Sequence, residues 1–72
     1  MNAVVTCQIN GTRFFLTDDG LATDIPARAA TFRDQTDAQT TAIIETTQAA
    51  WEGFDWVGAY ILANGVVCEP DC

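Results

Sequence analysis

The dipeptide Asn10-Gly11 constrains this chain most strongly, because it stands between two segments whose polarity alternates from residue to residue. A tight type I′ turn needs positive φ at both central residues, and Asn and Gly tolerate this conformation best. Residues 3–9 alternate before the turn, and residues 12–17 alternate after it. The sequence therefore predicts an antiparallel hairpin at the start of the chain.

A two-residue loop also fixes which side chains share a face, since it pairs Cys7 with Phe14. The predicted apolar face carries Val5, Cys7, Ile9, Phe14 and Leu16. The other face is mostly polar, and Phe15 is its exception. We expect the apolar face to contact the core.

A second turn is predicted at residues 18–20, Asp-Asp-Gly, and the alternation from Leu21 to Ile25 predicts a third strand. The strand is expected to end near Pro26, which cannot donate to a ladder. A two-residue loop and a three-residue loop with a glycine bulge both fit the turn, so the register stays open. Residues 26–33 are expected to form a connection.

Thr36 and Gln39 match a capping box, in which the two side chains bond each other's free backbone N–H groups. An amphipathic helix is therefore predicted from Asp37 to Trp51. Its inner face is assigned to Thr40, Ile43, Ile44, Thr47, Ala50 and Trp51. Its outer face is assigned to Asp37, Thr41, Glu45, Gln48 and Glu52. Gly53 is placed to end the helix as a left-handed cap.

Residues 56–63 are bulky, aromatic and β-branched, and the Asn-Gly pair at 64–65 predicts a second hairpin with residues 66–69. This register pairs Ile61 with Cys68. The sheet face away from the helix is assigned to Trp56, Tyr60, Leu62, Val67 and Phe15. Two alternatives are that the faces are reversed, or that the connection at 26–33 covers the second face.

The predicted fold class is α+β, with an antiparallel sheet of four to five strands in the order β-β-β-α-β-β and one amphipathic helix packed on one face. With 72 residues, the chain is expected to form a single domain, 1–72. Ten acidic residues against three arginines, without lysine or histidine, give a formal net charge of -7. Because cationic side chains drive binding to phosphates and anionic lipids, neither nucleic acid nor membrane is expected as a direct partner.

The longest apolar run, 56–63, is far shorter than the roughly 20 residues of a membrane helix, so a soluble cytoplasmic protein is expected. Without histidine or lysine, an enzyme is not expected, and no cofactor is predicted. Three thiols lack the fourth ligand of a structural zinc site. Cys7 and Cys68 are expected as small buried residues and Cys72 as a terminal thiol. The alternatives are one disulfide, or a redox module using Cys68 and Cys72.

A short, lysine-free acidic chain with strand hairpins, one Ala/Thr-rich helix at 36–51 and a final hairpin at 56–69 resembles the small phage-encoded anti-CRISPR proteins. The resemblance covers the whole chain in its format. It implies a non-enzymatic inhibitor that occupies a basic nucleic-acid-binding surface of a defence complex in a bacterial host. The acidic residues would then stand in for phosphates.

The residues themselves are compatible with this mechanism, and together with the resemblance they lead us to expect a protein that binds and inhibits a basic protein or protein complex through acidic side chains and an aromatic anchor. The predicted partner-binding residues are Asp34, Asp37, Glu45, Glu52, Trp56 and Tyr60. The alternative is a homodimeric structural or assembly module that buries the face of Trp56 and Tyr60. No metal site is predicted.

Overall fold

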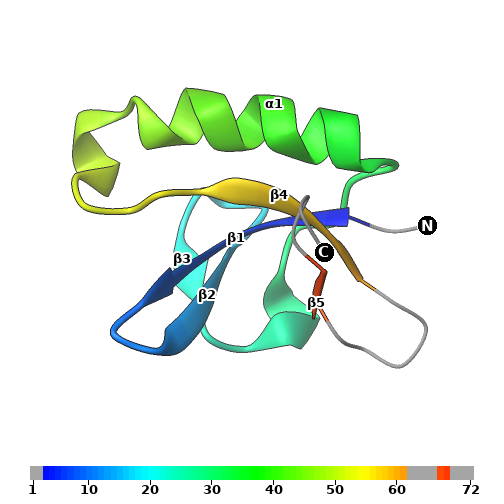
Figure 1. Cartoon of the computed structure of the whole chain (residues 1–72), viewed down its shortest axis with the longest axis horizontal. Helices are drawn as coiled ribbons and strands as arrows, with labels where there is room; N and C mark the ends of the chain where they lie inside the picture. The colour runs from blue at the N-terminus through cyan, green and yellow to red at the C-terminus, as the bar shows by residue number, and fades with distance from the viewer. Residues whose placement is uncertain (1–2, 62–66, 69–72) are drawn as a thin grey trace.

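The first hairpin opens a five-stranded antiparallel sheet, which one α-helix covers on one face in the computed structural model (Figure 1). The structure describes residues 3–61 and 67–68. The elements are β1 (Ala3–Ile9), β2 (Thr12–Leu16), β3 (Ala22–Thr23), η1 (Pro26–Arg28), α1 (Gln35–Thr46), η2 (Ala49–Trp51), β4 (Val57–Ile61) and β5 (Val67–Cys68). The strand order across the sheet is β3-β2-β1-β4-β5. The predicted α+β class and β-β-β-α-β-β order are confirmed.

The hairpin of β1 and β2 has the predicted turn and register. Asn10 and Gly11 have φ of 52° and 82°, as a type I′ turn requires. Cys7 pairs with Phe14, and Ile9 pairs with Thr12. The local sequence is therefore sufficient to define this element.

The loop between β2 and β3 is the three-residue alternative. The Thr17 N–H donates to the Leu21 carbonyl at 2.8 Å, and Gly20 closes the loop with φ of 78°. The strand that follows is shorter than predicted, because only two residues pair with β2. Leu21 and Ile25 lie outside it and are 62% and 46% exposed.

The connection at 26–33 is hydrogen-bonded to the sheet, at the end of β2 and at the start of β1. The Ala30 N–H donates to the Leu16 carbonyl at 2.9 Å, and Phe32 exchanges two backbone hydrogen bonds with Ala3 at 3.0 and 2.8 Å. Ala29 packs on the sheet face opposite α1. In Figure 1, η1 lies on that side of the sheet. The alternative in which this segment covers part of the second face therefore holds.

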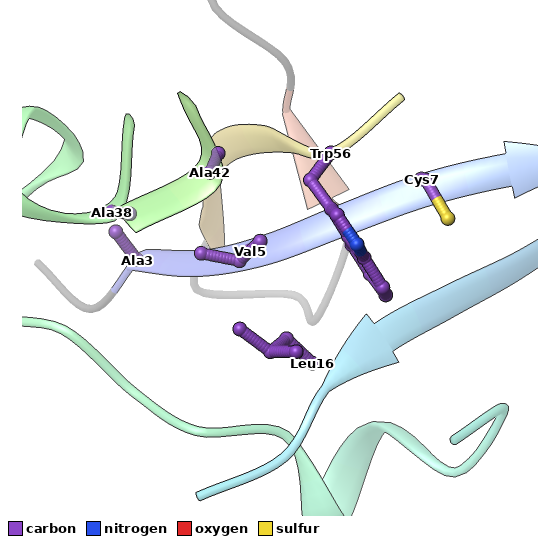
Figure 2. Close-up of a cluster of buried hydrophobic side chains, with 7 residues drawn as sticks. All are labelled: Ala3, Val5, Cys7, Leu16, Ala38, Ala42 and Trp56. Atoms are coloured by element: carbon purple, nitrogen blue, oxygen red, sulfur yellow. The ribbon is translucent and has the colours of Figure 1, made fainter. Parts of the chain in front are cut away.

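Two apolar clusters fill the two sides of the sheet. The main cluster lies between α1 and the sheet and consists of Ala3, Val5, Cys7, Leu16, Ala38, Ala42 and Trp56 (Figure 2). The smaller cluster on the other face consists of Val4, Phe15 and Ala59, with Ala29 and Val67 packed against it. The predicted faces of the first hairpin are confirmed, since Val5, Cys7 and Leu16 all face the helix.

The start of α1 differs from the prediction. Asp34, rather than Thr36, caps the helix, because its Oδ1 accepts the Asp37 N–H at 2.9 Å. Gln39 makes no capping box, since its Oε1 accepts the N–H of Gly58 at 2.9 Å. The cap therefore lies two residues before the predicted one, and the Gln39 side chain serves the sheet instead.

The end of the helix also differs, because the predicted single helix is divided into α1 and η2. The Thr47 N–H and hydroxyl both turn back to the Ile44 carbonyl, at 3.2 and 2.7 Å. The Thr46 hydroxyl accepts the Trp56 N–H at 3.1 Å and ties the last turn to the sheet. Gly53, with φ of 89°, therefore follows η2 rather than the α-helix.

The predicted inner face of α1 is wrong for its largest residues, whereas Asp37 is exposed as predicted. Ala38 and Ala42 are fully buried, whereas Ile43 and Ile44 are 57% and 53% exposed. Gly58 gives the physical reason, because a Cβ on it would meet the backbone of α1, 2.8 Å from the Ala38 carbonyl carbon. At Gly58 helix and sheet approach so closely that the helix faces the sheet there with small side chains, those of Ala38 and Ala42.

Two glutamine side chains of α1 bond to the backbone of Gly58, at a position where β5 does not pair with β4. The Gln35 Nε2 donates to the Gly58 carbonyl at 3.3 Å, and Gln39 accepts the Gly58 N–H. β5 pairs with β4 only at Tyr60 and Ile61. The two glutamines thus take the place of a neighbouring strand, as buried backbone groups require.

The β4 face assignment is also reversed, as one of the two alternatives foresaw. Trp56 is 3% exposed in the main cluster, and Tyr60 pairs with Ala3 of that cluster, so both lie on the helix side. Val67 does lie on the predicted opposite side. Cys68 pairs with Tyr60 instead of Ile61, a shift of one residue. Leu62 and the predicted Asn-Gly turn at 64–65 lie outside the described residues.

Candidate functional site

The surface of the described residues carries mainly acidic charged groups. The exposed acidic residues are Asp18, Asp19, Asp24, Asp34, Asp37, Glu52 and Asp55. Arg28 and Arg33 are the exposed arginines among residues 3–61 and 67–68, while Arg13 is half-buried and donates to the Thr6 hydroxyl at 3.2 Å. Acidic groups therefore dominate the described surface.

Asp34 and Asp37 are brought together at the beginning of α1, where the helix dipole favours negative charge. Arg33 lies 3.9 Å from Asp34 and 4.0 Å from Asp37. The Arg33 side chain is 86% exposed, and the two aspartates are 51% and 54% exposed. Exposed pairs of this length contribute little, so both carboxylates are accessible to another cation.

Glu45 has a different environment from the one expected. It is half-buried, and its Oε2 accepts the Trp51 Nε1–H at 2.8 Å. Trp51 in turn packs edge-on against Trp56, with ring centroids 5.2 Å apart. Glu45 therefore holds the end of the aromatic core, whereas Glu52 is exposed beyond η2.

Trp56 cannot serve as an exposed aromatic anchor, because its ring lies inside the molecule. Figure 2 shows it crossing β1 beside Val5 and Cys7. It stacks with Phe54 at a centroid distance of 5.6 Å. Its Nε1 is buried and has no acceptor within the described part of the chain. The half-buried Tyr60 is likewise on the helix side, so the predicted aromatic contact face is not formed by these two residues.

The outer face of α1 carries apolar residues that the periodicity of the sequence predicts in the core. Its exposed residues are Thr36, Asp37, Thr40, Ile43, Ile44 and Thr47. The signal that would have identified this face is the pair Ala38 and Ala42, four residues apart and in phase with Gln35 and Gln39. Periodicity weighted by residue size favoured the wrong side of the helix.

An open hollow of about 490 Å³ lies between the β2–β3 loop and η1. Asp18, Asp19 and Leu21 form one side of it, and Arg28 forms part of the other. Carboxylates and a guanidinium of opposite charge line the same open space. The hollow does not select a ligand of either sign.

The cysteines differ from one another in chemistry. Cys7 is a buried free thiol, and burial raises its pKa. Cys68 is disulfide-bonded, in a bond that does not involve Cys7. No group of three potential metal ligands occurs in residues 3–61 and 67–68. Over the same residues, no helix has the length and hydropathy needed to cross a membrane.

Comparison with known proteins gives no match: no family model fits the chain, and no curated protein or solved structure is significantly similar to it.

Proposed function

We propose that this chain is a non-enzymatic protein that binds a basic surface of a nucleic-acid-binding protein and inhibits it. The observation that carries the proposal is the excess of exposed carboxylates, seven against two exposed arginines in the described residues. Carboxylates form charge-assisted pairs with the Arg and Lys side chains that otherwise contact phosphates. A surplus of this sign also speeds encounter with a cationic partner.

The contacts that we assign to this function are the carboxylates of Asp34 and Asp37 at the start of α1 and that of Glu52, which follows η2 after the end of the helix. All three residues are exposed. Glu45 is not assigned, because it is bonded to Trp51. A homodimer through Trp56 is not proposed, because that side chain is 3% exposed.

The resemblance to small phage-encoded anti-CRISPR proteins supports a more specific form of this proposal. In that form the partner is a nucleic-acid-binding complex of a bacterial defence system, and the protein acts in the cytoplasm of the bacterial host. The acidic side chains would compete with nucleic acid for one basic surface.

The test is affinity capture from nuclease-treated bacterial lysate at low and high salt, with two variants of equal net charge. In the helix-end variant, Asp34→Asn, Asp37→Asn and Glu52→Gln remove three charges. Asn still caps a helix, so α1 is retained. In the control variant, Asp18→Asn, Asp19→Ser and Asp24→Asn remove three charges from the β2–β3 region.

We expect the wild type and the control to retain a nucleic-acid-binding protein that high salt releases, and the helix-end variant to lose it. Added nucleic acid should displace the same protein, since both ligands use one basic surface. Capture that is insensitive to salt, or no retention of a nucleic-acid-binding protein, would refute the proposal. Equal loss in both triple variants would refute the assignment to the helix ends.

A further inference from the structure

The helix α1 places its small apolar residues inward and its large ones outward. Ala38 and Ala42 contact the sheet, while Ile43 and Ile44 face solvent with 57% and 53% of their surface exposed. These two large isoleucines leave more than half of their surface in solvent, while the smaller alanines are fully buried. Their position is therefore unexplained by the stability of this chain alone.

The threonines beside these isoleucines make the face more apolar than its composition indicates. The Thr40 hydroxyl donates to the Thr36 carbonyl at 3.0 Å, and the Thr47 hydroxyl donates to the Ile44 carbonyl at 2.7 Å. Each hydroxyl is thus bonded to the backbone of its own helix. Such a threonine needs no hydrogen bond from a partner and offers its methyl group for contact.

These residues form a stripe at helical spacing. Thr36, Thr40, Ile43 and Thr47 follow one another at steps of four, three and four, and Ile44 lies beside them. Asp34 precedes the stripe, Asp37 lies in the first turn of α1 beside it, and Glu52 follows it in the sequence, beyond η2. Residues 35–46 contain no lysine or arginine.

We propose that this stripe is the docking site for a basic amphipathic helix of the partner protein. The partner's apolar side chains would pack on Ile43 and Ile44, and its Lys or Arg side chains would reach the carboxylates at the two ends of α1. Charge complementarity selects this occupant. A second copy of the chain would bring carboxylates of the same sign to the same stripe.

This inference rests on the proposed function. The apolar stripe adds a contribution to the binding free energy that salt does not screen. Charge attraction weakens as ionic strength rises, whereas burial of apolar surface does not. The two contributions can therefore be removed one at a time. Ile43→Gln with Ile44→Gln removes the apolar stripe, and Gln favours the helix at least as well as Ile does.

The probe is a synthetic helical peptide of about 18 residues, with Leu on one face and Lys and Arg toward both ends. A peptide of the same composition in scrambled order is the control for charge alone. Affinity is measured by calorimetry at about 0.05 and 0.5 M NaCl, where the Debye length differs several-fold. Leu21→Gln, at a residue that is 62% exposed and belongs to the β2–β3 loop, is the matched control variant.

We expect the amphipathic peptide to bind more tightly than the scrambled one at both salt concentrations. The double isoleucine variant should lose about tenfold in affinity at both, with an unchanged salt slope, and Leu21→Gln should lose nothing. The variant with Asp34→Asn, Asp37→Asn and Glu52→Gln should instead show a reduced salt slope.

Equal affinity for the two peptides, or an unchanged affinity of the double isoleucine variant, would overturn the inference. If that variant still captures a salt-released nucleic-acid-binding protein from lysate as the wild type does, the proposed function stands without this docking site. Sedimentation of the wild type and of the double isoleucine variant tests whether the chain forms a dimer. A wild-type dimer that the double isoleucine variant abolishes would show that a second copy occupies the stripe, contrary to the proposal.

Discussion

Gly58 shows how one residue sets the distance between helix and sheet. A methyl group there would meet the backbone nitrogen of Gln39 and lie 2.8 Å from the Ala38 carbonyl carbon. We predict that Gly58→Ala lowers the free energy of unfolding by about 2 to 3 kcal/mol, because α1 must move away and strain its hydrogen bonds to β4. Urea unfolding followed by circular dichroism measures the effect.

The control for this prediction is Thr40→Ala on the outer face of the same helix. Its effect should stay within about 0.5 kcal/mol, since it changes an exposed residue. A Gly58→Ala protein as stable as the Thr40→Ala protein would contradict the close contact between helix and sheet.

Cys7 should make stability depend on alkaline pH. Burial is the main cause that raises its thiol pKa, Arg13 partly opposes this and Asp55 adds to it. The folded pKa lies above the unfolded one, so the contribution of the protonated thiol is complete below the unfolded pKa and is lost as pH rises toward the folded pKa. We predict that the free energy of unfolding falls as the pH rises above the pKa of an unfolded thiol, about 8.5, and falls less in Cys7→Ala. Parallel pH profiles of the two proteins would disprove it.

Among the elements, the first hairpin was predictable and the helix faces were not. Asn10 and Gly11 determine the turn by their own backbone preferences, and the turn then sets the register of β1 and β2. The buried side of α1 depends instead on Gly58, which lies 20 residues after Ala38. Periodicity weighted by side-chain size predicts Ile43 on the buried side. Side-chain size carries no information about how closely the helix approaches the sheet, so this prediction is wrong.

The same reasoning explains the candidate site. The acidic character of the surface follows from composition, and Asp34 and Asp37 were placed correctly near the helix start. Glu45 was misplaced because its partner, Trp51, depends on where α1 ends. Trp56 was misplaced because the side of β4 that faces the helix is set by Gly58 and not by alternation. Local patterns therefore predict charge and turns, and tertiary contacts decide burial.

The side chain of Asp34 is the N-cap of α1. Asp34→Ala should cost about 1 kcal/mol, because the Asp37 N–H loses its acceptor, and Asp34→Asn should cost only a few tenths. Thr36→Ala should be close to neutral, since the Thr36 side chain is exposed within the first turn and is not the cap. Thermal unfolding of the three variants tests this ranking. A larger loss for Thr36→Ala than for Asp34→Ala would restore the predicted capping box.

For the whole molecule, a net charge of -7 on 72 residues means that folding brings like charges together. We predict that the melting temperature rises by a few degrees as NaCl increases from about 0.01 to about 0.15 M, because the Debye length falls from about 30 to about 8 Å. The variant with Asp18→Asn, Asp19→Ser and Asp24→Asn should melt higher at low salt and respond less to added salt. A melting temperature that falls with salt would mean that ion pairs outweigh repulsion.

Comparison of the two triple variants separates two explanations of the acidic surface. If the surplus charge only keeps the molecules apart in solution, any three carboxylates are equivalent for this purpose, and the two triple variants should behave alike in capture. If the carboxylates at the ends of α1 contact a partner, the variants should share the weaker response of stability to salt and differ in capture. Removing Asp34, Asp37 and Glu52 would then abolish binding while the protein stays folded. The contrast distinguishes a specific contact from a general property of the charge.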